Sequence, residues 1–456
     1  MSLPTKSFAV LGAGITGLTA AHRLVQQGCR VRVFERLDRI GGSVATERID
    51  GWLIERGPNS VLEGEPAMSA LIKELGLESK RQVANQAAKK RFIVRYGQVL
   101  PTPMGPGSFF GTNLFSFGAK CRIMGELFQR RRTRPTDVSL EQLVCDHFGP
   151  EIVAYGLNPF VGGVYAGIPA KLSAQHSFPA VWNAEREHGS IIRGMIAAAK
   201  ARKARGEPRG GIISFEGGLQ TLIDTLGSAL PAGAVTLNAQ VERLQPGPRW
   251  TVTWRDSQGE HSEEFDGVLS ALPAAGLAAL RIGAGDERPL ALLGEIEQPP
   301  VASLFLGYRR EQVQHPVDGF GALIPAAEKF SMLGVLFSST LFPRRAPDGH
   351  VALTVMVGGA RQPEIAHLAP ADLLRRVQPE LQQLLGVTGE PIFQRHSLWT
   401  RAIPQYNLGY ERFLTAMDAV EQAHPGFWLG GQARDGIAMP ACLAAGEKLA
   451  ARALGR

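Results

Sequence analysis

Three glycines near the N-terminus have the spacing of a phosphate-binding turn. Gly12, Gly14 and Gly17 follow the apolar run SFAVL and open the amphipathic segment ITGLTAAHRL. The first glycine allows a tight turn, the second lets the backbone approach a pyrophosphate, and the third lets a helix pack against the strand. The helix would begin at Ile15 and Thr16 and offer its free N–H groups to phosphates. The spacing therefore predicts a dinucleotide site.

A carboxylate at the expected distance extends this motif. The run CRVRVF alternates as a strand does and is followed by Glu35, about 20 residues after the turn, where a carboxylate accepts hydrogen bonds from ribose hydroxyls. Arg36 is the next candidate contact. Strand, turn, helix, strand and acid together are typical of a βαβ nucleotide-binding unit.

Two further turns indicate which dinucleotide is bound. Gly41 and Gly42 come shortly after the acid, and the segment ERGPNS follows. This extension resembles the FAD-binding start of the glutathione-reductase-like flavoproteins, particularly the amine oxidase and phytoene desaturase branch. There the second glycine pair lets the chain pass close to the pyrophosphate and the flavin ring. The resemblance implies FAD as the cofactor and adds four contacts from the third turn, namely Gly57, Pro58, Asn59 and Ser60.

The same branch closes its FAD site with a C-terminal strand, turn and helix. Residues 427–429 are predicted as the strand and Gly430 and Gly431 as the turn, while DGIAMPACLAAG opens a helix whose first amides would face the electron-rich edge of the flavin. The resemblance adds contacts from Val241, Ile437, Ala438 and Met439. Two positions depart from the family pattern and concern the flavin edge: Ala441 stands where an acid is common, and Gly431 where some members carry Asn.

These turns must be positioned by a chain of 456 residues, which suits two or three domains. The predicted fold is α/β, or α+β overall. A Rossmann-like FAD-binding domain is assembled from residues 1–90, 211–296 and 401–456. Alternating apolar runs in 297–400 predict an antiparallel sheet with one covered face, which could floor a pocket for a flat hydrophobic molecule. Residues 91–210 are predicted to be a helical domain.

Charge and cysteine usage restrict the partners. The four cysteines have no metal-ligand spacing, which predicts reduced thiols in a cytoplasmic protein without a bound metal. No apolar run approaches the roughly 18 residues of a membrane span. The basic run 129–134 and the aromatic cluster 109–117 fit two interpretations, ordinary helix packing or peripheral contact with the inner face of a membrane. Nucleic acid is disfavoured, because no known binding module accompanies the net charge of +7. The sequence fits a monomer and a homodimer equally.

No side-chain constellation for acid–base, nucleophilic or metal catalysis is recognisable in the sequence. A redox cofactor would then carry the chemistry, and the protein would position the substrate. The segment AAKKRFIVRYG contains Arg91 and Arg95 within an apolar run, and a guanidinium can bind a carboxylate through two hydrogen bonds. Taken alone, the pattern favours a strand whose arginines point into solvent.

Over nearly its whole length the chain resembles the oxygen-dependent, FAD-containing protoporphyrinogen oxidase family. The likeness lies in segments such as GAGITGLTAAHRL, ERGPNS, AAKKRFIV, GGVYAG, GFGALIP, VMVGGARQP and IPQYNLGY. It implies oxidation of protoporphyrinogen IX to protoporphyrin IX in haem biosynthesis, by hydride transfer to FAD and reoxidation by oxygen to give hydrogen peroxide. It assigns Arg91 to a substrate propionate and Gly163 to the pocket wall facing the flavin. The macrocycle would be lined by Phe320, Leu323, Leu333 and Met356, with no catalytic residue beyond the flavin.

Three alternatives remain at this point. A coproporphyrinogen III oxidase of the same family would take a substrate with more propionates and favour more positive charge around the pocket. An amine oxidase or a desaturase is more distant, since the segment LGGQARDGIAMP lacks the aromatic pair expected of an amine oxidase. The third alternative is a flavoprotein that binds tetrapyrroles without turnover.

Overall fold

The computed structural model describes residues 5–64, 66–132, 134, 136–206 and 210–456. A five-stranded parallel sheet forms the nucleotide-binding part, in the order β10-β2-β1-β14-β21. Its strands are β1 (Ser7–Leu11), β2 (Arg30–Phe34), β10 (Val235–Thr236), β14 (Gly267–Ser270) and β21 (Phe427–Leu429). All five residues of β1 are buried, as expected of a central parallel strand that is covered on both faces. The α/β prediction is confirmed.

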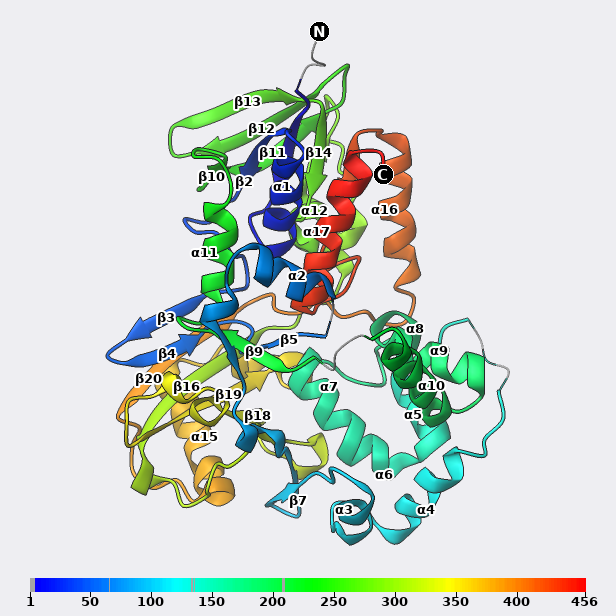
Figure 1. The fold of residues 1–456 in the computed structure, drawn as a ribbon, viewed down its shortest axis with the longest axis vertical. Coiled ribbons are helices and arrows are strands. Elements are labelled where there is room, and N and C mark those ends of the chain that lie inside the picture. The colour runs from blue at the N-terminus through cyan, green and yellow to red at the C-terminus, as the bar shows by residue number, and fades with distance from the viewer. Residues whose placement is uncertain (1–4, 65, 133, 135, 207–209) are drawn as a thin grey trace.

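Three helices from distant parts of the chain lie together beside this sheet: α1 (Ile15–Gln26), α11 (Gln220–Ser228) and α17 (Met439–Ala453) (Figure 1). Helices α1 and α17 touch backbone to backbone. A Cβ atom on Gly446 would lie 2.4 Å from the carbonyl oxygen of Thr16. The hydroxyl of Thr16 donates to the carbonyl of Cys442 at 2.8 Å. The C-terminal helix is thereby fixed against the start of α1.

Smaller sheets surround this core. One is built of β11 (Gln240–Gln245), β12 (Trp250–Asp256), β13 (Gly259–Phe265) and β15 (Arg281–Ile282). A hairpin of β3 (Thr46–Ile49) and β4 (Trp52–Glu55) follows the second glycine turn. A three-stranded sheet joins β5 (Val61–Leu62), β6 (Arg81–Val83) and β9 (Ile212–Phe215).

A seven-stranded sheet forms the second large part, in the order β20-β16-β19-β18-β17-β7-β8. Its strands are β7 (Phe92–Arg95), β8 (Gln98–Pro101), β16 (Val301–Arg309), β17 (Gly321–Leu323), β18 (Met332–Phe337), β19 (His350–Gly358) and β20 (Phe393–Trp399). Helix α15 (Pro370–Leu385) covers one face through Leu373, Val377 and Leu381, which pack with Leu304, Val335 and Val355.

Residues 92–101, which the predicted domain bounds assign to the helical domain, form strands β7 and β8, in agreement with the strand that the pattern around Arg91 and Arg95 favours. They form a hairpin whose two turn residues, Tyr96 and Gly97, both have positive φ, as tight hairpin turns require. Strand β7 then pairs in parallel with β17, whereas β17 and β18 are antiparallel. The hairpin is therefore an edge of the large sheet, because its apolar residues Phe92 and Val94 join the core of that sheet.

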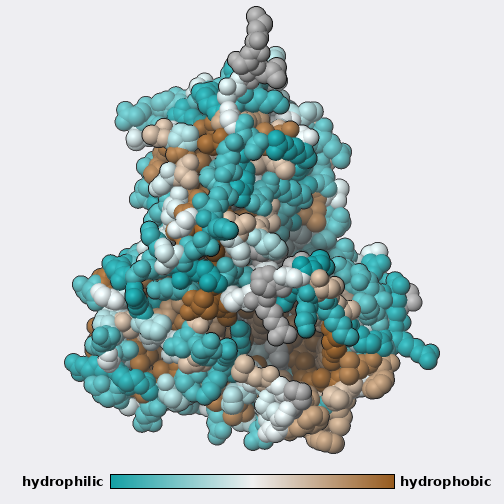
Figure 2. All heavy atoms as spheres, viewed as in Figure 1, coloured by the Kyte–Doolittle hydropathy of each residue, from teal (hydrophilic) through white to brown (hydrophobic). Residues whose placement is uncertain are grey.

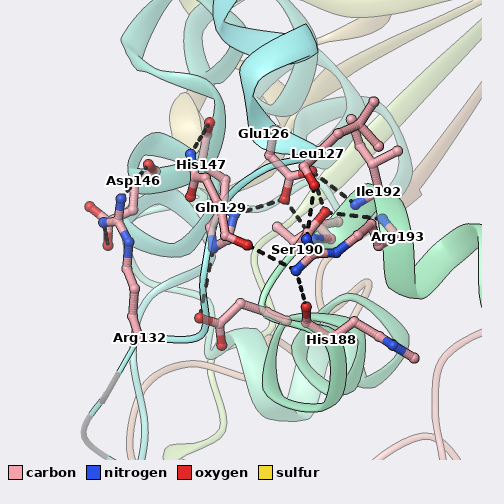
Figure 3. A network of polar contacts seen from close by, with 12 residues as sticks. Glu126, Leu127, Gln129, Arg132, Asp146, His147, His188, Ser190, Ile192 and Arg193 are labelled. Carbon is pink, nitrogen blue, oxygen red and sulfur yellow. Dashed lines mark hydrogen bonds and ion pairs between the residues drawn. The ribbon is translucent and has the colours of Figure 1, made fainter.

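The helical part lies beside the large sheet (Figure 1) and contains α3 (Pro106–Gly111), α4 (Phe117–Glu126), α5 (Leu140–Phe148), α6 (Pro150–Ile152), α7 (Asn158–Tyr165), α8 (Ala174–Ser177), α9 (Pro179–His188) and α10 (Ile191–Ala204). A buried polar network holds it together (Figure 3). The Glu126 carboxylate accepts from the Ser190 hydroxyl at 2.7 Å and from the N–H of Ile191 at 2.6 Å, and it lies 2.9 Å from Nδ1 of His147. This carboxylate caps the start of α10. Within the described residues, no helix combines the length and apolarity of a membrane span.

Candidate functional site

The first glycine turn joins β1 to α1 with the geometry that its sequence predicts. Gly12 has φ +95° and donates its N–H to the carbonyl of Phe34 at 2.8 Å. A Cβ on Gly17 would lie 1.9 Å from the carbonyl oxygen of Gly12, so a side chain there would push helix and turn apart. Gly14 occupies the N-cap position of α1 without a side chain to cap the helix, and Ile15 and Thr16 after it are buried.

Glu35 ties the end of β2 to this turn. Its buried carboxylate accepts the N–H of Ala13 and the N–H of Leu37, both at 2.9 Å. The carbonyl of Glu35 also accepts the N–H of Ala239, two residues before Val241 in β11. Arg36 is exposed, and its assignment to the cofactor stays a prediction.

The second and third turns stack on the first. Gly41 donates its N–H to the carbonyl of Ala13 at 2.8 Å, and a Cβ on Gly42 would lie 3.4 Å from Cα of Gly14. A Cβ on Gly57 would lie 1.9 Å from the carbonyl oxygen of Ser43. The turns at Gly12–Gly14, Gly41–Gly42 and Gly57 thus lie together, and at each of them the backbone is not covered by a side chain of its own. Pro58, Asn59 and Ser60 continue the third turn toward β5.

Two arginines that the sequence analysis missed hold these turns. Arg39 donates to the carbonyls of Ile40, Gly42 and Val44 at 2.8–3.2 Å. Its position two residues before the glycine pair was the only signal in the sequence.

The second arginine is Arg345, which closes the short turn 343–345 after β18. It donates to the carbonyl of Asn59 at 2.5 Å and pairs with Glu55 at 3.3 Å. Both side chains are buried. Burial lowers the pKa of Arg345 to about 10 and raises the pKa of Glu55, although the Thr46 hydroxyl and the N–H of Leu219 stabilise that carboxylate. Through its hydrogen bond to the carbonyl of Asn59 and its contact with Glu55, Arg345 anchors the third turn to the segment between β18 and β19 of the large sheet.

The C-terminal segment brings a second helix start to the same region. Gly431 has φ +102°, and a Cβ there would lie 3.8 Å from the Thr16 hydroxyl oxygen. Its N–H donates to the Asp435 carboxylate at 2.9 Å. Ile437 and Ala438 lead into α17, where Met439 is buried. Gly430 is also close-packed, since a Cβ there would meet Leu449 at 2.8 Å.

Three of the predicted substrate residues, Leu323, Leu333 and Met356, lie on one face of the large sheet, whereas Phe320 packs with Ala88, Leu341 and Phe342. Leu323 is paired with Gly334, Gly334 with Met356, and Met356 with Ser303, so all four project from the same side. The residues that alternate with them along the strands, such as Leu304 and Val355, face α15. The side of the sheet that carries Leu323 and Met356 therefore faces away from α15. Helix α7 packs here, because a Cβ on Gly163 would lie 2.3 Å from Cδ2 of Leu323. Leu333 clusters with Ala166, Val301 and Met356.

The third turn reaches this sheet as well. The Trp399 indole N–H donates to the carbonyl of Arg56 at 2.8 Å, and Arg56 Nε lies 3.4 Å from the hydroxyl of Ser397, which is paired with Ser303. The turn with Gly57 is thereby placed next to the face that carries Met356.

The two arginines of the segment 91–95 have different environments. Arg91 is exposed, and its guanidinium carbon lies 5.0 Å from the centre of the Phe320 ring. Arg95 does not point into solvent as the strand pattern suggested. It is buried, donates to Glu151 at 2.7 Å and to the carbonyl of Leu114, and stacks 4.2 Å from the Tyr155 ring. Arg95 is therefore structural.

The site meets a direct test of whether it fits a dinucleotide. Neither α1 nor α17 has a side-chain cap or an acidic residue in its first turn, and the first residues of both helices, Ile15 and Met439, are buried. Buried N–H groups at a helix start need acceptors. A pyrophosphate at α1 and the electron-rich edge of a flavin at α17 would supply them, so the residues present fit FAD.

Fold and site together define an FAD-dependent oxidoreductase. Residues 15–454 match the family model described as "Flavin containing amine oxidoreductase", and the chain belongs to this family. The chain is 36% identical over 474 residues to protoporphyrinogen oxidase 2, chloroplastic/mitochondrial, of Arabidopsis thaliana, covering 98% of this chain and 93% of that protein. It is 27% identical to coproporphyrinogen III oxidase of Bacillus subtilis (strain 168), covering 100% and 99%. A crystal structure from Exiguobacterium sp. 255-15 superposes with a TM-score of 0.83, at 25% identity and with 100% of both chains covered.

Proposed function

We propose that the protein oxidises protoporphyrinogen IX to protoporphyrin IX in haem biosynthesis, with oxygen as the final acceptor and hydrogen peroxide as the by-product. The observation that carries this proposal is the apolar side of the large sheet with Leu323, Leu333 and Met356, adjoining the bare-backbone turns. Such a face accepts a flat hydrophobic ring. The name of the Arabidopsis relative supports the same substrate.

Bound FAD would supply the acceptor for the electrons that leave the substrate. The residues of this chain position the two reactants. The turn at Gly12 and Gly14 would hold the pyrophosphate at the start of α1, and Ile437, Ala438 and Met439 would lie at the flavin edge. Gly163 would keep the wall between substrate and cofactor thin, since any larger residue would meet Leu323. Arg91 would bind one propionate at the rim, with its guanidinium resting on Phe320.

Coproporphyrinogen III is the second candidate substrate, and the Bacillus subtilis relative supports it. Coproporphyrinogen III carries more propionate groups than protoporphyrinogen IX. A larger number of positively charged side chains around the substrate would therefore favour coproporphyrinogen III.

The experiment offers both porphyrinogens in parallel to the purified yellow protein in air, with a control lacking enzyme, and follows porphyrin fluorescence over time. We expect protoporphyrinogen IX to be oxidised faster, with oxygen consumed and hydrogen peroxide formed. Faster oxidation of coproporphyrinogen III would assign the second substrate. If FAD is bound and neither rate exceeds the control, the proposed function is wrong.

We further propose that the helical part contacts a membrane surface peripherally, on the cytoplasmic side. Phe110, Phe117 and Phe128, on or next to α3 and α4, are exposed by 59%, 80% and 84%. Apolar residues gather over the lower right of the molecule, where α7 and its neighbouring helices lie (Figure 2). Exposed aromatics beside a basic run are typical of a surface that binds anionic lipid headgroups. A monomer or a homodimer would serve this proposal equally.

A further inference from the structure

The C-terminal turn after β21 is held by two buried tyrosines from a segment outside the nucleotide-binding sheet. The hydroxyl of Tyr406 donates to the carbonyl of Gln432, and the hydroxyl of Tyr410 donates to the carbonyl of Ala433 at 2.7 Å. The two rings pack with their centres 4.5 Å apart. Each phenol thus serves one of two consecutive peptide groups of the turn.

The hydrogen bonds inside the turn explain why these two carbonyls need outside partners. The N–H groups of Arg434 and Asp435 both donate to the carbonyl of Gly431 at 2.9 Å, and the Asp435 carboxylate accepts the N–H of Gly431. The next two carbonyls along the chain, those of Gln432 and Ala433, accept hydrogen bonds from the two phenol hydroxyls. A buried carbonyl without a donor costs free energy, so loss of a phenol would let the turn rearrange.

The tyrosine segment is tied on its other side to the helical part. The carbonyl of Tyr406 accepts the N–H of Ser173 at 2.8 Å and the hydroxyl of Ser177 at 3.1 Å. The Asp137 carboxylate accepts the N–H of Gly409 at 2.9 Å. Tyr406 therefore contacts the start of α8 through its backbone and the C-terminal turn through its side chain.

We propose that Tyr406 and Tyr410 are positioning residues whose hydroxyls set where residues 437–439 and the start of α17 meet the flavin. The inference rests on the proposed flavin contacts of Ile437, Ala438 and Met439. Burial raises the pKa of both phenols, which keeps them protonated as donors. The tyrosines thereby link the position of the helical part to the environment of the cofactor.

The test removes single hydroxyls in the full-length protein. The variants are Tyr406→Phe, Tyr410→Phe and the double variant. The matched control is Tyr308→Phe, because Tyr308 is fully buried in β16 and its hydroxyl has no hydrogen-bond partner among the described residues. The measurements are the dissociation constant of FAD, the visible absorption spectrum and midpoint potential of the bound flavin, and the melting temperature of the apoprotein.

We expect the double variant to bind FAD at least about tenfold more weakly, or about 1.4 kcal/mol, and to show a shifted flavin spectrum and potential. Each single variant should show part of this change, so either one suffices if the other does not fold. Tyr308→Phe should match the wild type in FAD affinity, flavin spectrum and midpoint potential. The proposal is overturned if affinity, spectrum and potential stay unchanged, or if only the apoprotein melting temperature falls. No porphyrinogen is present in these assays, so a failure of the proposed substrate would leave their outcome intact.

Discussion

Arg91 and Arg95 are four residues apart, yet only one is free to bind a ligand. Arg95 is enclosed by Glu151 and Tyr155, whereas Arg91 is exposed beside Phe320. We expect Arg91→Ala to raise KM for the porphyrinogen about tenfold or more, because a hydrogen bond to a charged group contributes about 1.5–3 kcal/mol. FAD content and melting temperature should not change. Steady-state kinetics with flavin quantification checks this. The exposed neighbour Lys89→Ala is the control, and an unchanged KM in Arg91→Ala would remove this residue from the substrate site.

At the scale of elements, the contact between α1 and α17 determines where both uncapped helix starts lie. Gly446 makes this contact possible, and the atom that a Cβ would meet there belongs to the backbone. We expect Gly446→Ala to lower the free energy of unfolding by about 1–3 kcal/mol and to weaken FAD binding, since overpacking displaces α1. Urea unfolding and FAD titration measure both effects. Gly125→Ala in α4 is the control: nothing lies within 4 Å of its added Cβ, so the free energy of unfolding should stay equal or rise by up to about 1 kcal/mol. Equal behaviour of the two variants would contradict the packing argument.

At the scale of the whole molecule, α3 and α4 lie at the opposite end from the nucleotide-binding sheet (Figure 1), and the exposed Phe110, Phe117 and Phe128 lie on or next to these two helices. We expect the double variant Phe117→Ser/Phe128→Ser to bind vesicles with anionic phospholipids at least tenfold more weakly, because each aromatic side chain loses about 1.5–3 kcal/mol of burial. Turnover of dissolved substrate should be retained. Vesicle co-sedimentation checks this prediction, with Ile392→Ser as a control, since Ile392 is exposed just before β20 in the large sheet. Equal binding by all three proteins would exclude these aromatics from membrane contact.

The glycine turns, the position of Glu35 and the strand at 427–429 could be predicted from the sequence because each depends on local backbone requirements. Gly12 and Gly431 have positive φ, and Gly17 leaves no room for a side chain. Such constraints are imposed by neighbouring residues and are visible in a short stretch of sequence.

Tertiary structure alone decided the remaining contacts. The ion pair of Glu55 with Arg345 joins residues 290 positions apart, and the hairpin of β7 and β8 joined the large sheet through the pairing of β7 with β17. Arg91 and Arg95 are the same residue type in one segment, so only the packing around them decides that Arg95 is buried against Glu151 while Arg91 stays exposed beside Phe320. The sequence by itself determined which turns could hold a dinucleotide, because those turns are local. The fold decided which distant side chains anchor them, because burial and long-range pairing depend on the whole chain.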